Sequence, residues 1–115
     1  MKNYICYIRG ENFLFELENS QEKVGFYTAL FLKAKDEESA ENFAIKNLIE
    51  NENLKKRTLN NPNESPLFYV EEIEEIANGF ENKSIGLAIF EVNDIEARME
   101  AFNITKDTAL SIITV

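Results

Sequence analysis

The stretch GFYTALFLKAK, residues 25–35, decides the fold together with DEESAENFAIKNLIENENL, residues 36–54, which follows it directly. Residues 26–32 are aromatic, β-branched or apolar without a break, as expected of a strand that is covered on both faces. The pattern then changes to a period of three to four residues, which predicts a helix. We therefore expect a central strand that leads into an amphipathic helix.

The predicted helix has a recognisable start and one apolar stripe. Asp36 suits the N-cap, because its carboxylate can accept a hydrogen bond from a free amide of the first turn. The stripe consists of Ala40, Phe43, Ala44, Leu48 and Leu54. Ile45 and Ile49 point away from this stripe, so a helix packed on one side leaves them exposed. An N-terminal hairpin, the loop at 58–66, or a second subunit or partner is expected to cover them.

Composition indicates a single domain over residues 1–115, with 44% hydrophobic residues to supply a core. No apolar run is long enough to span a membrane, and charges interrupt the N-terminus where a signal peptide needs an apolar stretch. These features predict a cytoplasmic protein. The single cysteine, Cys6, lies in an apolar stretch and is expected to act as a small core residue.

The net charge of −9 argues against nucleic-acid binding, which needs surfaces rich in Lys and Arg. The surplus is uneven, since residues 58–82 contain six Glu and no Lys or Arg. Four of the six, Glu71, Glu72, Glu74 and Glu75, are nearly consecutive. This acidic segment is the most unusual part of the chain.

The N-terminal third predicts a hairpin before the central strand. Residues 3–8 and 13–17 have strand patterns, and Arg9, Gly10 and Glu11 give the turn between them. A polar turn at 19–23 then leads into the central strand.

After the long helix, Pro66 prevents helical continuation and a strand is expected from Leu67 to about Glu75. A strand places Glu71, Ile73 and Glu75 on one side, whereas a helix gives a shared face to Val70, Ile73, Ile76 and Ala77. We favour the strand.

Further along, Asn78 and Gly79 predict a turn, and residues 85–92 predict another buried strand. Asn93 and Glu96 resemble a capping box. The helix that follows has an apolar face of Ile95, Met99 and Phe102 and ends at Asn103. Residues 109–115 (ALSIITV) predict a final strand.

Read from residue 25, the order is strand, helix, strand, strand, helix, strand. This order predicts an α+β fold with a ferredoxin-like (βαββαβ) arrangement, preceded by a β-hairpin, with both helices on one face of an antiparallel sheet. The alternative is an antiparallel meander packed on the long helix alone.

Residues 25–76 resemble a family of small uncharacterised bacterial proteins. The shared features are a strand that starts with GFYT, a helix with an acidic start, and a strand that reads YVEEIEE. The family has no assigned activity. The resemblance therefore implies the order of the segments and transfers no site.

Catalytic motifs are absent from the sequence. There is no His, so Ser-His and Cys-His nucleophile pairs and His-based zinc sites are excluded. No glycine-rich phosphate-binding pattern occurs. The glutamates at 71–75 lack the spacing of a calcium loop. We therefore predict no catalytic residues, no cofactor and no metal, and favour a protein that is not an enzyme.

Two functions remain, and both depend on surfaces. The first is a small acidic protein-binding module, for example an immunity or antitoxin-like inhibitor of a basic protein, which uses Glu71, Glu72, Glu74, Glu75, Ile45 and Ile49. The second is a dimeric, ferredoxin-like regulatory module that binds a small molecule, which rests on fold analogy. A carboxylate enzyme that depends on divalent metal ranks last.

Overall fold

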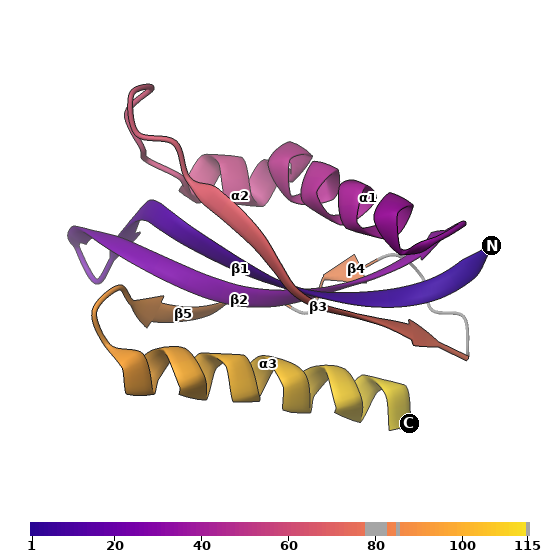
Figure 1. Cartoon of the computed structure of the whole chain (residues 1–115). Helices are drawn as coiled ribbons and strands as arrows, with labels where there is room; N and C mark the ends of the chain where they lie inside the picture. The colour runs from indigo at the N-terminus through magenta and orange to yellow at the C-terminus, as the bar shows by residue number, and fades with distance from the viewer. Residues whose placement is uncertain (78–82, 85, 115) are drawn as a thin grey trace.

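The computed structural model contains one antiparallel sheet with helices on both of its faces (Figure 1). It describes residues 1–77, 83–84 and 86–114, with side chains for residues 1–77 and 86–109. The elements in chain order are β1 (Lys2–Leu17), β2 (Ser20–Ala34), α1 (Glu37–Glu50), α2 (Glu52–Arg57), β3 (Leu67–Ile76), β4 (Lys83–Ser84), β5 (Ala88–Glu91) and α3 (Ile95–Thr114). The strand order is β3-β1-β2-β4, and β5 also pairs with β2.

β1 and β2 form one long hairpin that is closed by a two-residue turn. Glu18 and Asn19 both have positive φ, 47° and 72°, and two such residues make the type I′ turn that matches the twist of the flanking strands. The pairing runs from Leu17↔Ser20 at the turn to Lys2↔Ala34 at the far end. The turn is therefore tighter than the polar turn predicted at 19–23, most of which belongs to β2.

The predicted hairpin within residues 3–17 is wrong, because β1 is one continuous strand. In place of the predicted turn, the strand has a bulge between Gly10 and Phe13, with Asn12 at a φ of 63°. Gly10 serves close packing here, since a Cβ at this position would lie 2.5 Å from the ring of Phe26. β1 is consequently a central strand, paired with β2 on one edge and β3 on the other.

The α1 side of the sheet holds the larger core. β2 is buried continuously from Val24 to Leu32, which confirms the predicted central strand. The ring of Phe13 lies 4.9 Å from that of Phe26 and 5.4 Å from that of Phe68, measured between centroids. α1 packs its buried Ala40, Ala44 and Leu48 onto this side.

The predicted helix is confirmed, but it divides into two. The Ser39 amide donates to Asp36 Oδ1 at 2.8 Å, so Asp36 is the N-cap as predicted. Asn51 ends α1, and its Oδ1 accepts from the Leu54 amide at 2.9 Å to begin α2. Phe43 is 46% exposed, so the buried stripe is narrower than predicted.

The C-terminal segment is a helix where the sequence predicts a strand. α3 continues through residue 103 and ends at Thr114, and it covers the sheet face opposite α1 (Figure 1). The strand predicted at 109–115 is therefore wrong over residues 109–114, and residue 115 lies outside the described residues. Asp94 caps the helix, since its Oδ1 accepts from the Ala97 amide at 2.9 Å, one residue after the predicted cap.

Tertiary packing explains why β-branched residues are helical in α3. The small residues Ala101, Thr105 and Ala109 recur every four positions and are buried against the sheet. The Thr105 hydroxyl donates to the Ala101 carbonyl at 2.9 Å, which satisfies the hydroxyl within the helix. The predicted apolar face is wrong for Ile95 and Met99, which are 75% and 61% exposed.

The ferredoxin-like order is not supported. Its two helices share one face, whereas α1 and α3 lie on opposite faces of this sheet (Figure 1). β1, which the sequence treats as an addition, sits between β2 and β3. Of the strand predicted at 85–92, residues 88–91 form β5. The predicted turn at Asn78 and Gly79 and residue 85 lie outside the described residues.

Candidate protein interaction site

The acidic segment forms the edge strand β3, as the strand prediction for Leu67 to about Glu75 requires. Its inner edge pairs with β1 from Glu11↔Leu67 to Asn3↔Ile76. Its outer edge has no strand partner among residues 1–77, 83–84 and 86–114. β3 is therefore a ten-residue open edge of the sheet.

A bulge in β3 gathers three of the glutamates on the α3 side. Tyr7 pairs with Glu72 and Ile8 pairs with Val70, so Glu71 is the extra residue. Residues that lie opposite each other share a face, and Tyr7 and Ile5 belong to the cluster under α3. Glu72 and Glu74, their partners, therefore lie on the α3 side.

The other two glutamates, Glu71 and Glu75, lie on opposite sides of the sheet. Glu71 lies on the α3 side, where Arg9 approaches it. Glu75 lies on the α1 side, opposite Tyr4. The predicted shared side is confirmed for Ile73 and Glu75. It is wrong for Glu71, because the bulge shifts the alternation by one residue.

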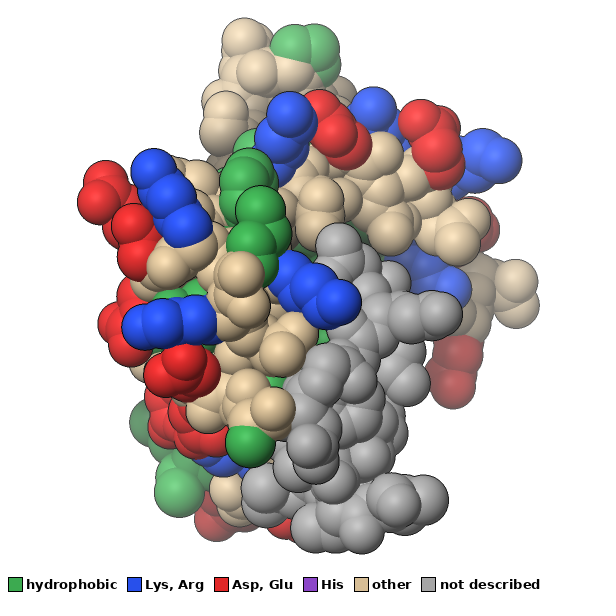
Figure 2. All heavy atoms as spheres, turned by 90° about the vertical axis from the view of Figure 1, so that its right-hand side faces the viewer, with side chains coloured by type: hydrophobic (Ala, Val, Ile, Leu, Met, Phe, Trp, Pro, Cys, Tyr) green, Lys and Arg blue, Asp and Glu red, His purple; other side chains and the backbone are tan. Residues whose placement is uncertain are grey.

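Each of the four glutamates has a cation from another part of the chain. Glu71 Oε1 lies 2.8 Å from Arg9 Nε, and Glu75 Oε1 lies 3.9 Å from Lys2 Nζ. Lys106 of α3 pairs with both Glu72 and Glu74, the latter at 3.5 Å. Figure 2 shows the side of the molecule that lies on the right of Figure 1, where Lys and Arg side chains lie beside Asp and Glu side chains. The excess of negative charge in residues 58–82 is thus largely balanced by cations from other parts of the chain.

Lys106 forms ion pairs with two of the glutamates on the α3 side. Its ammonium lies 4.3 Å from the centroid of the Tyr7 ring, a favourable cation–π position. Burial lowers the pKa of Lys106, but the hydrogen bond to Glu72 and the charges of Glu72 and Glu74 raise it above its ordinary value. One cation therefore serves two carboxylates, which remain 43% and 46% exposed.

Between Phe68 and Ile73, the α1 side of β3 is apolar. Phe68, Val70 and Ile73 are half-buried and pack against the main core. Beside them lies a groove of about 380 Å³. Its lining consists of Phe13, Leu48, Ile49, Leu54, Lys55, Thr58, Pro66 and Phe68. β3 therefore presents an apolar side and an acidic side along one open edge.

The two isoleucines singled out from the sequence have different surroundings. Ile45 is half-buried against the main core. Ile49 is 55% exposed and lines the groove. Thr58 and Pro66, from the two ends of the loop, line the same groove. The structure thus brings Ile49 near the start of β3, and leaves it partly uncovered.

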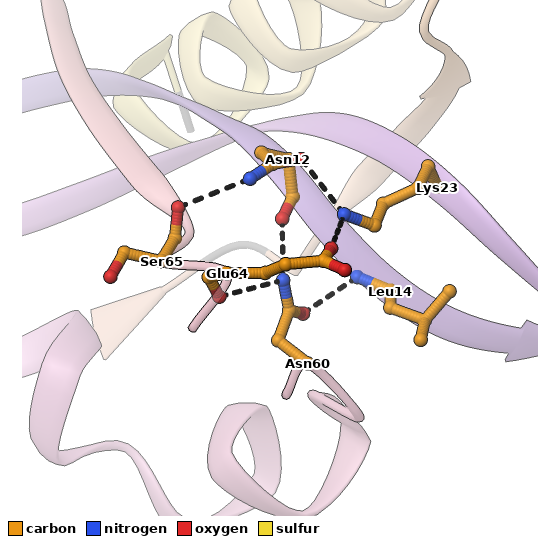
Figure 3. A network of polar contacts seen from close by, with 6 residues as sticks. All are labelled: Asn12, Leu14, Lys23, Asn60, Glu64 and Ser65. Atoms are coloured by element: carbon orange, nitrogen blue, oxygen red, sulfur yellow. Dashed lines mark hydrogen bonds and ion pairs between the residues drawn. The ribbon is translucent and has the colours of Figure 1, made fainter. Parts of the chain in front are cut away.

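Sequence reasoning missed the residue that holds this loop, Asn60 (Figure 3). Its Oδ1 accepts from the Leu14 amide at 2.8 Å, and its Nδ2 donates to the Asn12 carbonyl at 2.7 Å. The Leu59 amide adds a bond to the Leu14 carbonyl at 2.9 Å. The Asn60 side chain therefore bonds the backbone of β1 just beyond the point where its pairing with the first residue of β3 stops. In the sequence, the Asn residues around Pro62 predict a loop, and nothing in them distinguishes Asn60 from its neighbours.

Other candidate chemistry is weak in the described part of the chain. No group of three or more acidic or sulfur side chains there is placed to hold a metal ion. Burial raises the pKa of the Cys6 thiol to about 12, which makes it a poor nucleophile at neutral pH. No helix within those residues is long and apolar enough to cross a membrane.

Comparisons with protein-family models, curated proteins and solved structures gave no match to this chain. The interpretation of the β3 edge therefore depends on its own geometry and charge.

Proposed function

We propose that the protein is a small protein-binding module, of the immunity or antitoxin-like inhibitor type, whose partner is a basic protein. The observation that carries this proposal is the open β3 edge, with Glu71, Glu72 and Glu74 on one side and an apolar groove on the other. An open edge is a row of unpaired backbone donors and acceptors that another chain can pair with.

Charge supports a basic partner in spite of the internal ion pairs. Glu72 and Glu74 share the single ammonium of Lys106, so this pair of carboxylates keeps a net negative charge that attracts a second cation. Exposed ion pairs of this kind contribute little to stability, about 0–1 kcal/mol each, and are readily exchanged. Carboxylates at the rim of an interface act mainly on the association rate.

The lack of His in the sequence and the burial of Cys6 support a binding role over catalysis. The sequence has no His, and the Cys6 thiol is buried with a raised pKa. Catalysis by an acid and base pair needs groups whose pKa lies near the working pH.

Affinity capture with matched variants tests the proposal. The wild-type chain is immobilised, exposed to lysate of the source organism, and eluted at low and then high salt. A second column carries Glu71→Gln, Glu72→Gln, Glu74→Gln and Glu75→Gln together. The control column carries a variant with four Glu→Gln changes outside β3. They lie at the exposed positions Glu16, Glu18, Glu22 and Glu100.

The proposal expects a basic protein on the wild-type and control columns, released by high salt, and a marked loss from the β3 column. Equal capture on all three columns would contradict a role for the β3 glutamates. Circular dichroism and melting curves of the variants check that each one folds.

A second candidate, binding of a small molecule, is favoured by a cavity near the β1 bulge. Its volume is about 720 Å³, which falls in the usual range of ligand pockets, roughly 300–1,000 Å³. Its wall includes Phe90, Arg98 and Lys23. A rise in melting temperature with one member of a metabolite panel would support this function, and no response across the panel would argue against it.

A further inference from the structure

We propose that the partner binds by adding an extended segment as a further strand on the outer edge of β3, with apolar and basic side chains in alternation; this rests on the proposed function. The inner edge of β3 is fully engaged with β1, apart from the bulge at Glu71. The outer edge is a row of backbone donors and acceptors without a strand partner among the described residues. An added strand satisfies such a row directly.

The two sides of β3 specify which side chains such a strand carries. Successive residues of a strand point to opposite faces. Side chains on the α1 side meet Phe68, Val70 and Ile73, beside the groove. Side chains on the α3 side meet the carboxylates of Glu72 and Glu74. The best fit is therefore a strand in which every second residue is Lys or Arg and the residues between them are apolar.

The geometry favours this occupant over a second copy of the chain. Pairing of two β3 strands would place one acidic edge against another, and like charges on neighbouring strands are destabilising. A basic strand relieves the repulsion that a second β3 strand would create.

Lys106 acts as an internal competitor in this arrangement. It occupies the position between Glu72 and Glu74 that an incoming cation requires. Its removal leaves the two carboxylates without their shared cation. Lys106→Gln therefore strengthens binding of a basic strand, whereas a merely structural role predicts weaker or unchanged binding. Lys46→Gln, at an exposed position of α1, is the matched control.

The test uses synthetic peptides of the same length as β3, ten residues. The probe alternates Lys and Val. One control has the same composition with all Lys before all Val, and another alternates Glu and Val. Two further versions of the probe carry N-methyl groups on every second residue, in one phase or the other, which blocks ladder hydrogen bonds on one edge and keeps every side chain.

The proposal expects the alternating Lys–Val peptide to bind and to protect β3 backbone amides from exchange with solvent. N-methylation abolishes binding in one phase and spares it in the other. Lys106→Gln raises affinity and the pair Glu72→Gln and Glu74→Gln lowers it, each by roughly fivefold. Equal binding of both N-methyl versions, or protection located away from β3, would overturn strand addition.

The outcomes separate this inference from the proposed function. If the Lys–Val peptide does not bind while lysate capture still depends on the β3 glutamates, strand addition is wrong and the acidic binding site stands. If capture is also independent of these glutamates, both proposals fail. If the peptide with all Lys before all Val binds as tightly as the alternating peptide, binding is by charge attraction without strand pairing, and the inference is overturned.

Discussion

The two faces of the sheet are covered by helices in different ways. On the α1 side, Ala40, Ala44 and Leu48 pack on an aromatic core. On the α3 side, the apolar clusters are smaller, and long charged side chains lie over rings: the Arg98 guanidinium is 5.1 Å from the Phe90 centroid, and Lys106 lies over Tyr7. The first face is held mainly by apolar contacts, and the second combines apolar contacts with ion pairs.

We therefore expect stability to depend mainly on the α1 side of the sheet, and the proposed attraction of a basic partner to depend on the charges of the α3 side. Apolar burial on the α1 side is not screened by salt as ion pairs are, and it fixes the hairpin and α1. Ion pairs on the α3 side are partly exposed and can be exchanged for those of a partner. The β3 edge joins the two, because its side chains alternate between them.

Phe26→Ala on the α1 side should have the largest effect. The ring is fully buried, and it packs with Phe13 and fills the space left by Gly10. We expect the free energy of unfolding to fall by about 3–5 kcal/mol. Phe43→Ala, at an exposed position of α1, should change it by less than about 1 kcal/mol. Urea unfolding of both variants provides the measurement, and equal losses would contradict the assigned core.

Phe102→Ala on the α3 side should have a smaller effect. This half-buried ring stacks on Tyr27 with centroids 4.9 Å apart. Its loss should lower the free energy of unfolding by about 1–2 kcal/mol. A loss as large as that of Phe26→Ala would show that the two faces are equally important for stability.

Cys6 makes the α1 side sensitive to alkaline pH. Burial raises the pKa of this thiol from 9.0 to about 12. Well below pH 9 both the folded and the unfolded state hold the proton, and the contribution of the thiol to stability is fully present. As pH rises towards 12, the unfolded thiol ionises and the folded thiol does not, so stability falls, by roughly 1 kcal/mol at pH 10. Cys6→Ala should show a shallower decline between pH 8 and 10, and an unchanged decline would contradict this.

Lys106→Gln should give the smallest change in stability. Its ion pairs with Glu72 and Glu74 are partly exposed, so we expect a loss below about 1 kcal/mol at low ionic strength, and almost none in high salt. Lys46→Gln is again the control. A large loss that persists in high salt would mean that Lys106 acts through packing, and that the α3 side is not held by exchangeable charges.

Local signals predicted the elements that depend on local sequence. The unbroken apolar run of β2, the Asp36 cap of α1 and the strand after Pro66 are all present. The predictions failed where distant packing decides. The Phe26 ring packs against Gly10, and β1 has a bulge next to this glycine where the sequence predicts a turn. In α3, the burial of Ala101 and Ala109 keeps a segment with β-branched residues helical.

The candidate site was predictable only in part. The glutamates of β3 stand out in the sequence because residues 58–82 lack Lys and Arg. Their cations do not stand out, since Lys106 is 34 residues away from Glu72 and lies in a segment that was expected to be a loop between a helix and a strand. The bulge that aligns Glu71 with Glu72 is likewise a property of the pairing with β1 and not of β3 alone.

The most direct test of the β3 site is the salt dependence of an association rate. A fluorescent alternating Lys–Val peptide is mixed with the wild-type chain, and with the variant that carries Gln at the four β3 positions, over a series of salt concentrations in a stopped-flow instrument. The wild-type rate should be high at low salt and fall steeply as salt screens the glutamates. The variant should be slower at low salt and should depend less steeply on salt, because it keeps the other negative charges of the chain. Identical rates and identical salt dependence for the two proteins would contradict the account.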